Sequence, residues 1–308
     1  MILRASYGTL ALLGYNEKIV EGQMTAFFML DGKCVFDCWF CSHARSAKTP
    51  NKFLSRVVWK EIELSEVVDR AAKSPYVKRI CLQVVSYPGY REDVVKALNE
   101  FHGKPISVSV RATSLEEVEM YFENGADMVG ISIDAVTEDL HKKIRGGSLK
   151  EVLELLEKAS LKYPKKITTH LIVGLGETEK DMVSIIDWLL KRNITVALFA
   201  FTPIKGTKLQ DRKKPSIGSY RRIQLAHFLL KEKIISFDKI KFNKRGEITD
   251  FGTKLSALDE SYVKKAFLTQ GCPNCRRPFY NESPKEELYN IHDDKMLKNV
   301  QLPDLSSS

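Results

Sequence analysis

Six apolar segments with the character of β-strands alternate along this chain with segments that have helical spacing of apolar residues. Strands that alternate with helices favour a parallel sheet with right-handed crossovers. The pattern holds six β/α units between residues 24 and 232, fewer than the eight of a complete TIM barrel. A partial (β/α)6 barrel and a doubly wound open sheet are both compatible with it, although no Gly-x-Gly-x-x-Gly motif opens a helix. The expected strands cover residues 24–30, 77–85, 106–112, 127–135, 166–174 and 195–201, and the expected helices 63–74, 94–101, 115–125, 149–163 and 180–192.

This alternation divides the chain of 308 residues into three parts. Residues 1–23 form an N-terminal extension, residues 24–232 hold the β/α units, and residues 233–308 form a C-terminal extension. Within the last part, residues 234–252 are expected to form one or two short strands and residues 255–268 a helix. From about residue 296 the chain is polar, which is typical of a frayed end.

Composition and charge narrow the class of protein. A hydrophobic content of 44% excludes a disordered or fibrous chain. No apolar run approaches the ~18 residues of a membrane span, and Glu17, Lys18 and Glu21 interrupt the apolar start that a signal peptide needs. We therefore expect a cytoplasmic protein without membrane contact. The net charge of +9 indicates either a solvated surface or attraction to an acidic partner; without a nucleic-acid-binding motif, nucleic acid is not expected as that partner.

Five of the six cysteines stand in two tight clusters, CVFDCWFC and CPNC. In a reducing cytosol such thiols bind metal rather than pair in disulfides. The first cluster spaces Cys34, Cys38 and Cys41 as Cys-x3-Cys-x2-Cys. These three thiolates can bind three irons of a [4Fe–4S] cube, which usually takes four thiolates. The fourth iron of such a cube is then open to a small ligand.

The cysteine motif resembles that of the radical S-adenosylmethionine (SAM) superfamily, in which the open iron chelates the amino and carboxylate groups of SAM. Phe40 matches the aromatic residue that precedes the third cysteine in that family. The resemblance implies a partial (β/α)6 barrel whose reactive groups lie at the C-terminal ends of the strands. A zinc site or a chance cluster is the alternative interpretation.

The same resemblance assigns polar residues to a SAM pocket. Ser132 and Asp134 alternate on the fourth expected strand, so they point to one side, where related proteins hold the ribose hydroxyls of SAM. Arg145 and Arg111 compete for the SAM carboxylate, which a guanidinium grips in fork geometry. The alternatives are a buried polar pair that lines a barrel without ligand, and a surface salt bridge for each arginine.

The segment LIVGLGETEKD, after the fifth expected strand, resembles the glycine-rich segment of the family. Gly174 and Gly176 let the backbone approach a flat ligand, for which the adenine edge of SAM is the candidate. Glu177 either contacts SAM or serves as the N-terminal charge of the next helix. The face of His170 is undecided and it is interpreted as a core histidine, and His43 is interpreted as a loop residue.

The second cluster, Cys272 and Cys275, lacks partners for a zinc knuckle, because outside the first cluster the chain holds no other Cys-x-x-Cys pair. Cys81 is the remaining thiol, and its segment KRICLQVVSY resembles the stretch of biotin synthase that supplies a ligand to the auxiliary iron–sulfur cluster. A buried structural cysteine is the alternative for Cys81. If the three thiols share a second [4Fe–4S] cube, one iron lacks a ligand. Lipoyl synthases carry an Arg-Ser-Ser-Tyr segment whose serine caps such an iron, and Ser6 in RASY stands in a similar tetrapeptide.

The combination of RASYGT, CVFDCWFC and GCPNCRRPFYNESP resembles the two-protein lipoyl synthases over nearly the whole chain. Other lipoyl synthases differ by an N-terminal triplet of auxiliary cysteines. The resemblance implies two [4Fe–4S] clusters and SAM, whose cleavage gives a 5′-deoxyadenosyl radical that takes hydrogen from an octanoyl chain on a lipoyl carrier protein. The auxiliary cluster then donates sulfur. The implied partners are that carrier protein, a homologous second synthase subunit and an electron donor such as ferredoxin.

Three other functions are compatible with these residues. A biotin synthase-like enzyme would insert sulfur into a free small molecule. A radical SAM enzyme with a relay cluster would keep its auxiliary cluster intact through turnover. A noncatalytic scaffold subunit is the third alternative, and the complete triad of Cys34, Cys38 and Cys41 argues against it.

Overall fold

The computed structural model describes residues 1–15, 18 and 21–303. Within these residues the main feature is a curled sheet of nine strands in the order β3-β4-β1-β2-β5-β6-β7-β8-β9. Six of them pair in parallel register, which confirms the partial (β/α)6 barrel. The parallel strands are β2 (Thr25–Leu30), β5 (Arg79–Gln83), β6 (Ile106–Val110), β7 (Met128–Ile131), β8 (Ile167–Val173) and β9 (Thr195–Ala200).

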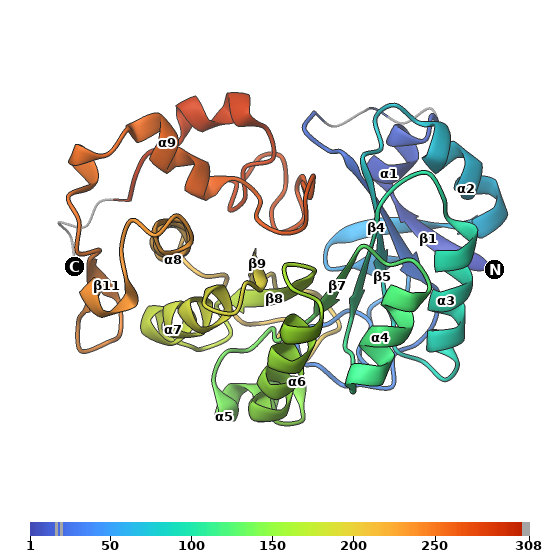
Figure 1. Cartoon of the computed structure of the whole chain (residues 1–308), viewed down its shortest axis with the longest axis horizontal. Helices are drawn as coiled ribbons and strands as arrows, with labels where there is room; N and C mark the ends of the chain where they lie inside the picture. Colours follow the sequence, from blue (N-terminus) through green and yellow to red (C-terminus); the bar gives the residue numbers. More distant parts are fainter. Residues whose placement is uncertain (16–17, 19–20, 304–308) are drawn as a thin grey trace.

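Helices lie along the outer side of this curled sheet (Figure 1). The connections between parallel strands contain α2 (Leu64–Lys73), α3 (Tyr90–Glu100), α4 (Leu115–Glu123), α6 (Leu149–Lys162) and α7 (Glu179–Leu190). A short helix α5 (Glu138–Leu140) and the π-helical turn η1 (His141–Arg145) precede α6, and α8 (Ile217–Lys231) follows β9. These elements place the long helices in the positions that right-handed crossovers require.

Strand β5 illustrates how the sheet separates core from site. Ile80 and Leu82 are 0% and 1% exposed and belong to the main apolar core beneath the helices. Because side chains alternate along a strand, Cys81 and Gln83 point to the opposite, inner side of the sheet. Cys81 accordingly packs with a separate, smaller cluster that includes Phe27 of β2. The concave side of the barrel is therefore free to hold a site.

The N-terminal extension belongs to the same sheet as the parallel strands. β1 (Ile2–Ser6) pairs antiparallel with β2 and with β4 (Val57–Glu63), and β3 (Phe53–Leu54) closes a hairpin with β4. Helix α1 (Tyr7–Leu12) follows β1. The hairpin was not predicted, because charged residues interrupt its apolar pattern and its pairing with β1 is long-range. Glu17 of the N-terminal extension and residues 304–308 of the tail expected to fray lie outside the described residues.

The C-terminal extension begins with the expected short strands and helical segment. β10 (Lys241–Phe242) and β11 (Ile248–Asp250) form a hairpin, and α9 (Glu260–Lys264) lies between the 3-10 turns η3 (Leu255–Ala257) and η4 (Lys265–Phe267). Further 3-10 turns are η2 (Phe237–Lys239) and η5 (Asp294–Asn299). The loop that follows residue 269 then covers the N-terminal ends of β2 and β5. There Thr25 Oγ1 donates to the carbonyl of Asn274 at 2.8 Å, and Arg79 Nε donates to the carbonyl of Pro273 at 2.9 Å.

Residues 278–282 close the lateral opening of the partial barrel. On one side Asn281 Nδ2 donates to the carbonyl of Ala200 at the end of β9, 2.7 Å away. On the other side Arg56, in the turn of the β3–β4 hairpin, donates to the carbonyl of Glu282 at 2.7 Å. Figure 1 shows this red C-terminal segment reaching toward the blue N-terminal strands. The two extensions together thus complete the wall that six parallel strands leave open.

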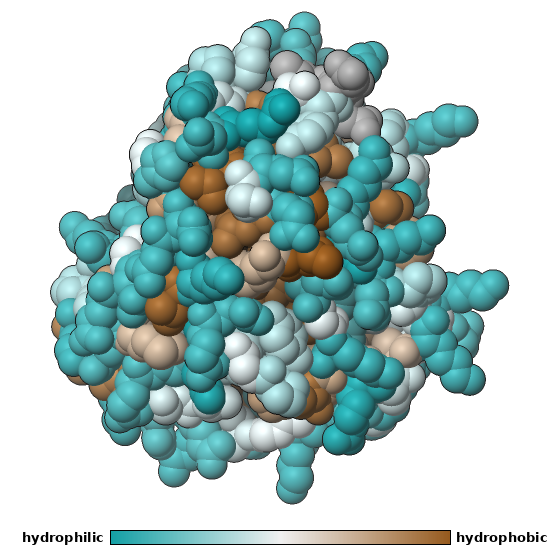
Figure 2. All heavy atoms as spheres, turned by 90° about the vertical axis from the view of Figure 1, so that its right-hand side faces the viewer, coloured by the Kyte–Doolittle hydropathy of each residue, from teal (hydrophilic) through white to brown (hydrophobic). Residues whose placement is uncertain are grey.

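Figure 2 shows the face on the right-hand side of Figure 1, where apolar side chains gather in the middle among polar ones. Among the described residues, no helix is both long enough and apolar enough to cross a membrane.

Candidate active site

The loop after β2 carries the first three cysteines at the C-terminal end of the barrel. Backbone hydrogen bonds hold it there, since Trp39 N donates to the Ile144 carbonyl at 2.8 Å and Cys41 N donates to the Cys38 carbonyl at 3.1 Å. Burial raises the pKa of the Cys38 and Cys41 thiols, and the charges of neighbouring cysteines add to this effect. A cation bound beside these two thiols favours their thiolate forms, which are the forms that ligate metal. This donor set fits an iron–sulfur cluster.

Both arginines predicted for the SAM pocket lie beside Cys38. Arg111 Nη1 is 3.4 Å from Cys38 Sγ, but its guanidinium also donates to the carbonyls of Arg145 at 2.8 Å and Gly146 at 2.6 Å. Arg145 donates from Nη2 to the Ser132 carbonyl at 2.7 Å, while its buried Nη1 has no hydrogen-bond partner in the described part of the chain. A buried unpaired donor is costly. Arg145 is therefore the arginine with an N–H left for an anionic ligand.

The polar pair expected on the fourth strand lies just after β7 and contacts Arg145. Asp134 Oδ2 accepts from Arg145 Nε at 2.7 Å, which neutralises a carboxylate that lines the inner cavity. The backbone of Asp134 has φ 62°, so the strict alternation expected from Ser132 to Asp134 breaks at this residue. Ser132 contributes its carbonyl to Arg145. Contact of either residue with ribose stays a prediction.

The glycine-rich turn after β8 is held by Glu177, whose carboxylate accepts from the backbone N–H of Gly174 at 2.6 Å and of Leu175 at 2.9 Å. Burial raises the pKa of this carboxyl group. Helix α7 itself is capped by Thr178, so Glu177 stabilises the turn in front of the helix. Gly174 (φ 104°) needs the absence of a side chain, because a Cβ there would lie 2.9 Å from Pro215 Cδ. These contacts explain the turn without a ligand, and the adenine contact of Gly174, Gly176 and Glu177 stays a prediction.

The other three cysteines meet at the opposite, N-terminal end of the barrel. Burial raises the pKa of the Cys81 thiol, and the nearby Cys272 and Cys275 raise it further. Burial also raises the pKa of Cys272 to about 11. Gln83 Nε2 donates to Cys81 Sγ at 3.0 Å, and Arg277 Nη1 donates to Cys275 Sγ at 2.8 Å. The fold thus brings together thiols that stand about 190 residues apart in the sequence.

Ser6 lines the same cavity as these thiols, at the end of β1. Its Oγ accepts from the backbone N–H of Thr9 at 3.2 Å and lies 2.9 Å from Thr9 Oγ1, so it is the N-cap of α1. A capping role alone accounts for a serine at this place. Its role as an iron ligand stays a prediction.

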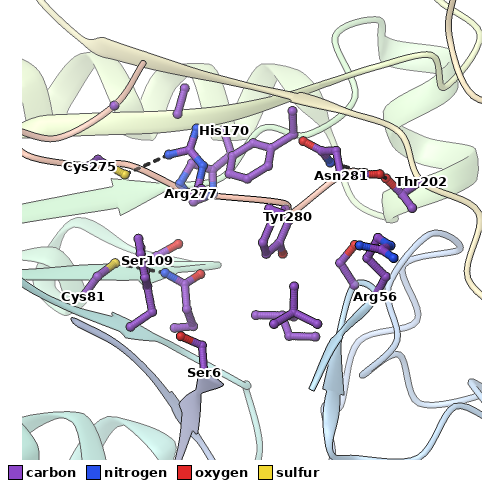
Figure 3. Close-up of a pocket in the computed structure, with 18 of the residues that line it drawn as sticks. Ser6, Arg56, Cys81, Ser109, His170, Thr202, Cys275, Arg277, Tyr280 and Asn281 are labelled. Atoms are coloured by element: carbon purple, nitrogen blue, oxygen red, sulfur yellow. Dashed lines mark hydrogen bonds between the residues drawn. The ribbon is translucent and has the colours of Figure 1, made fainter. Parts of the chain in front are cut away.

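A single cavity of about 450 Å³ extends from Cys41 of the first group to the second group of cysteines, and Figure 3 shows Cys81 and Cys275 beside it. Phe40 and Cys41 line its C-terminal end, and Cys81, Cys272 and Cys275 line its N-terminal end. The β3–β4 hairpin contributes residues 54–59 to one wall, and the C-terminal segment contributes residues 277–281 to another. The lining is largely apolar, which suits a hydrocarbon chain or the flat ring of a cofactor.

Two polar side chains that the sequence did not single out as ligands face this cavity. His170 points inward from β8, and burial, with Arg277 nearby, lowers its pKa to about 4, so the ring is neutral at pH 7. The hydroxyl of Tyr280 points into the cavity in Figure 3 and has no hydrogen bond to the described residues. The one signal for Tyr280 was its place in RRPFYN, directly after the second cysteine pair. His43, by contrast, is a buried loop residue, as interpreted from the sequence.

The cysteine groups do not form a site for a single metal ion. Among the described residues, no three histidine, cysteine or carboxylate side chains could hold one metal ion. A cube of four irons holds its thiolate ligands at separate corners, so it does not need three side chains around one ion.

Residues 32–189 match the family model of the radical SAM superfamily. The chain belongs to this superfamily. The matched part covers the first cysteine loop and the strands and helices through α7, where Arg111, Arg145 and Gly174 lie. Radical SAM proteins use a [4Fe–4S] cluster and SAM, and the buried thiols beside the unpaired N–H of Arg145 fit both. The protein is a radical SAM enzyme.

Several radical SAM relatives are similar to this chain at low identity. A biotin synthase from Hydrogenobaculum sp. is 24% identical over 249 residues, which cover 77% of this chain and 70% of the relative. A GTP 3′,8-cyclase from Limosilactobacillus fermentum is 26% identical over 129 residues, or 41% of this chain, and the chain spans 39% of that cyclase. The ribosomal protein uS12 methylthiotransferase RimO of Alteromonas mediterranea is 31% identical over 100 residues, covering 32% of this chain and 21% of the relative.

Solved radical SAM structures share the fold. Methylornithine synthase superposes with a TM-score of 0.52 at 16% identity, covering 73% of this chain and 67% of that one. The FeFe-hydrogenase maturase HydG from Carboxydothermus hydrogenoformans gives a TM-score of 0.51 at 19% identity, covering 73% of this chain and 56% of that one. At these identities the likeness shows the curled half-barrel alone.

Proposed function

We propose that this radical SAM enzyme is a sulfurtransferase of the lipoyl synthase type, which inserts sulfur into an octanoyl chain carried on a lysine of a lipoyl carrier protein. The observation that carries the proposal is the second group of thiols, Cys81, Cys272 and Cys275, on the far wall of the cavity that begins at Cys41. A carbon chain held between the two groups is within reach of both. The biotin synthase and methylthiotransferase relatives support sulfur chemistry in general.

In this proposal each cysteine group holds one [4Fe–4S] cluster. When bound, the first cluster supplies the electron that cleaves SAM, and the auxiliary cluster supplies the sulfur. The chain's own residues orient these groups: Arg145 Nη1 is available to the SAM carboxylate, and Arg277 and Gln83 donate hydrogen bonds to the auxiliary thiols. Donors to a thiolate sulfur stabilise the charged form that binds iron.

The walls of the cavity suit an acyl chain. Leu54, Val57 and Trp59 come from the β3–β4 hairpin, and Phe27 and Phe279 lie on other walls. These apolar side chains match a hydrocarbon chain and shield it from solvent. The tethered lysine fixes the far end of the chain, so a chosen carbon can meet the radical. A homologous second subunit and an electron donor such as ferredoxin complete the proposed system.

The test is an anaerobic incubation of the reconstituted enzyme with SAM, reductant and an octanoylated lipoyl carrier domain, followed by mass spectrometry. We expect a mass increase for a thiolated octanoyl-lysine and none for free octanoic acid. Because the chain carries a net charge of +9, binding to an acidic carrier domain should weaken as salt rises, with exposed charges screened beyond ~10 Å at ~0.1 M. Sulfur insertion into dethiobiotin or free octanoate, with none into the carrier, would favour the biotin synthase-like function instead. An auxiliary cluster that survives turnover intact would favour an electron relay.

A further inference from the structure

A second cavity, of about 1090 Å³, opens at the N-terminal end of the barrel. Its walls come from the beginnings of β7 and β9, the end of α8 and the loop at residues 270–273. Gly271 lines both this cavity and the one between the cysteine groups. The loop that carries Cys272 and Cys275 is therefore the partition between an inner site and an outer, solvent-facing hollow.

The outer hollow is strongly basic. Its lining holds one carboxylate, Asp187, and five exposed lysines, so we call it the lysine cavity. The five are Lys165, Lys191, Lys231, Lys233 and Lys239. Lys191 is paired with Asp187 at 2.6 Å, and Lys239 lies 3.8 Å from Asp238. The other three have no carboxylate partner among the described residues. Uncompensated positive charge around a hollow attracts anions.

A buried histidine gives the lysine cavity a second polar feature. His227 of α8 lines the cavity, is 2% exposed and makes no hydrogen bond within the part of the chain that the structure describes. Burial, with Lys231 nearby, lowers its pKa to about 3, so the ring is neutral at pH 7. A neutral imidazole offers one N–H donor and one acceptor, and both are available to a ligand that enters the cavity.

We propose that the lysine cavity is the docking site of an acidic protein, whose carboxylates pair with Lys165, Lys231 and Lys233. Lysines on an exposed rim are flexible point charges and suit separate carboxylates on a protein surface, whereas a small phosphate is usually gripped by an arginine fork or backbone N–H groups. The hollow, at about 1090 Å³, is also larger than the usual small-molecule pocket of ~300–1,000 Å³. A protein docked here lies against the outer side of the Cys272 loop without entering the inner cavity. This inference holds whatever chemistry the inner cavity performs.

Binding of a fluorescein-labelled oligoglutamate peptide to the reconstituted enzyme tests the proposal. The triple variant Lys165→Glu, Lys231→Glu, Lys233→Glu should weaken binding about tenfold or more at low salt and reduce its salt dependence. The matched control is Lys96→Glu, Lys158→Glu, Lys180→Glu, which makes the same charge change on exposed positions of α3, α6 and α7. We expect the control to keep most of the affinity. Zero-length carbodiimide cross-links of the wild type should map to the lysines of the cavity.

Variants of His227 distinguish binding inside the lysine cavity from binding to the lysines at its rim. His227→Gln keeps a neutral donor and acceptor, and His227→Leu removes both, so binding should weaken in the leucine variant with an unchanged salt dependence. Equal loss of affinity in the two triple variants would mean that net charge alone attracts the peptide, and would overturn the proposal. Displacement of the peptide by an equimolar amount of inorganic pyrophosphate would also overturn it, in favour of a small-anion site.

Discussion

The guanidinium of Arg277 donates from Nη1 to the Sγ of Cys275, 2.8 Å away. Its Nη2 donates to the carbonyl of Gln270 at 3.0 Å, and its Cζ lies 4.3 Å from the centre of the Phe199 ring. The arginine is thus fixed by contacts on two sides, with one N–H and a positive charge directed at a thiol. Arg277 therefore provides Cys275 with a charged hydrogen-bond donor.

Removal of this donor should weaken the auxiliary group selectively. In Arg277→Met the side chain stays unbranched and flexible but loses the guanidinium group, and with it the charge and the hydrogen bond to Cys275. We expect the reconstituted variant to lose iron from the second group faster than wild type when a chelator is added, with SAM cleavage retained. Arg276→Met is the control, because Arg276 donates to the Thr269 carbonyl and contacts no thiol. Equal iron loss in both variants would contradict a specific role for Arg277.

Replacement of Cys34, Cys38 or Cys41 by Ala should abolish reductive cleavage of SAM. The three residues stand on a loop at the surface end of the barrel, so the strands should fold without them. Formation of 5′-deoxyadenosine is measured by chromatography, and circular dichroism checks the fold. Retained 5′-deoxyadenosine formation in any single variant would show that its cysteine is not an essential ligand.

Iron analysis should distinguish one cluster from two. Reconstituted wild type is expected to hold about eight irons per chain, from two four-iron cubes. The double variant Cys272→Ala, Cys275→Ala should hold about half of that, cleave SAM and form no thiolated product. An unchanged iron content in the double variant would exclude this pair as ligands.

Gly174→Ala should destabilise the protein by about 2–4 kcal/mol, because it combines the strain of a positive φ with the crowding of Pro215. Gly125→Ala is the matched control. Its φ is 97°, but nothing lies within 4 Å of the added Cβ, so only the backbone strain of about 1–2 kcal/mol applies. Urea unfolding measures both free energies. Equal losses would show that the turn at Gly174 moves away from Pro215 without cost.

Stability should depend on pH through Glu282, whose carboxyl is 1% exposed. Burial raises its pKa to about 7, so the folded chain binds a proton more tightly than the unfolded chain, whose ordinary value is 4.5. The free energy of unfolding therefore increases as pH falls from about 7 to 4.5, and this added stability is lost as pH rises through 7. Glu282→Gln should remove this slope and stabilise the protein at pH 8.

Glu286→Gln is the control, because the pKa of this carboxyl is shifted in the opposite direction from that of Glu282. A hydrogen bond from Lys214 lowers the pKa of Glu286 to about 2, so its contribution is present above about 4.5 and is lost as pH falls toward 2. Denaturation of both variants and wild type across pH 2.5 to 8 compares the slopes. An unaltered slope in Glu282→Gln would show that this carboxyl is ionised in the folded protein at pH 6.

Local sequence determined the strands, the helices and the first cluster. The side chains that are buried on folding recur with the period of a strand or of a helix. This periodicity can therefore be read directly from the order of residues. Cys34, Cys38 and Cys41 lie within eight residues, and a loop that short can bring its thiols together without help from distant segments. For the same reason the resemblance to the radical SAM superfamily was visible in CVFDCWFC.

Tertiary structure alone decided what surrounds that cluster. Cys81 meets Cys275 because β5 turns it inward and the C-terminal loop covers the N-terminal ends of the strands, through contacts such as that from Arg79 to Pro273. The β3–β4 hairpin exists because β1 offers it an edge to pair with, and Tyr280 faces the cavity because residues 278–282 bridge the two edges of the sheet. Each of these features depends on pairs of residues far apart in the chain. A linear pattern records burial and local turns, but which distant segments pair is decided by the packing free energy of the whole fold.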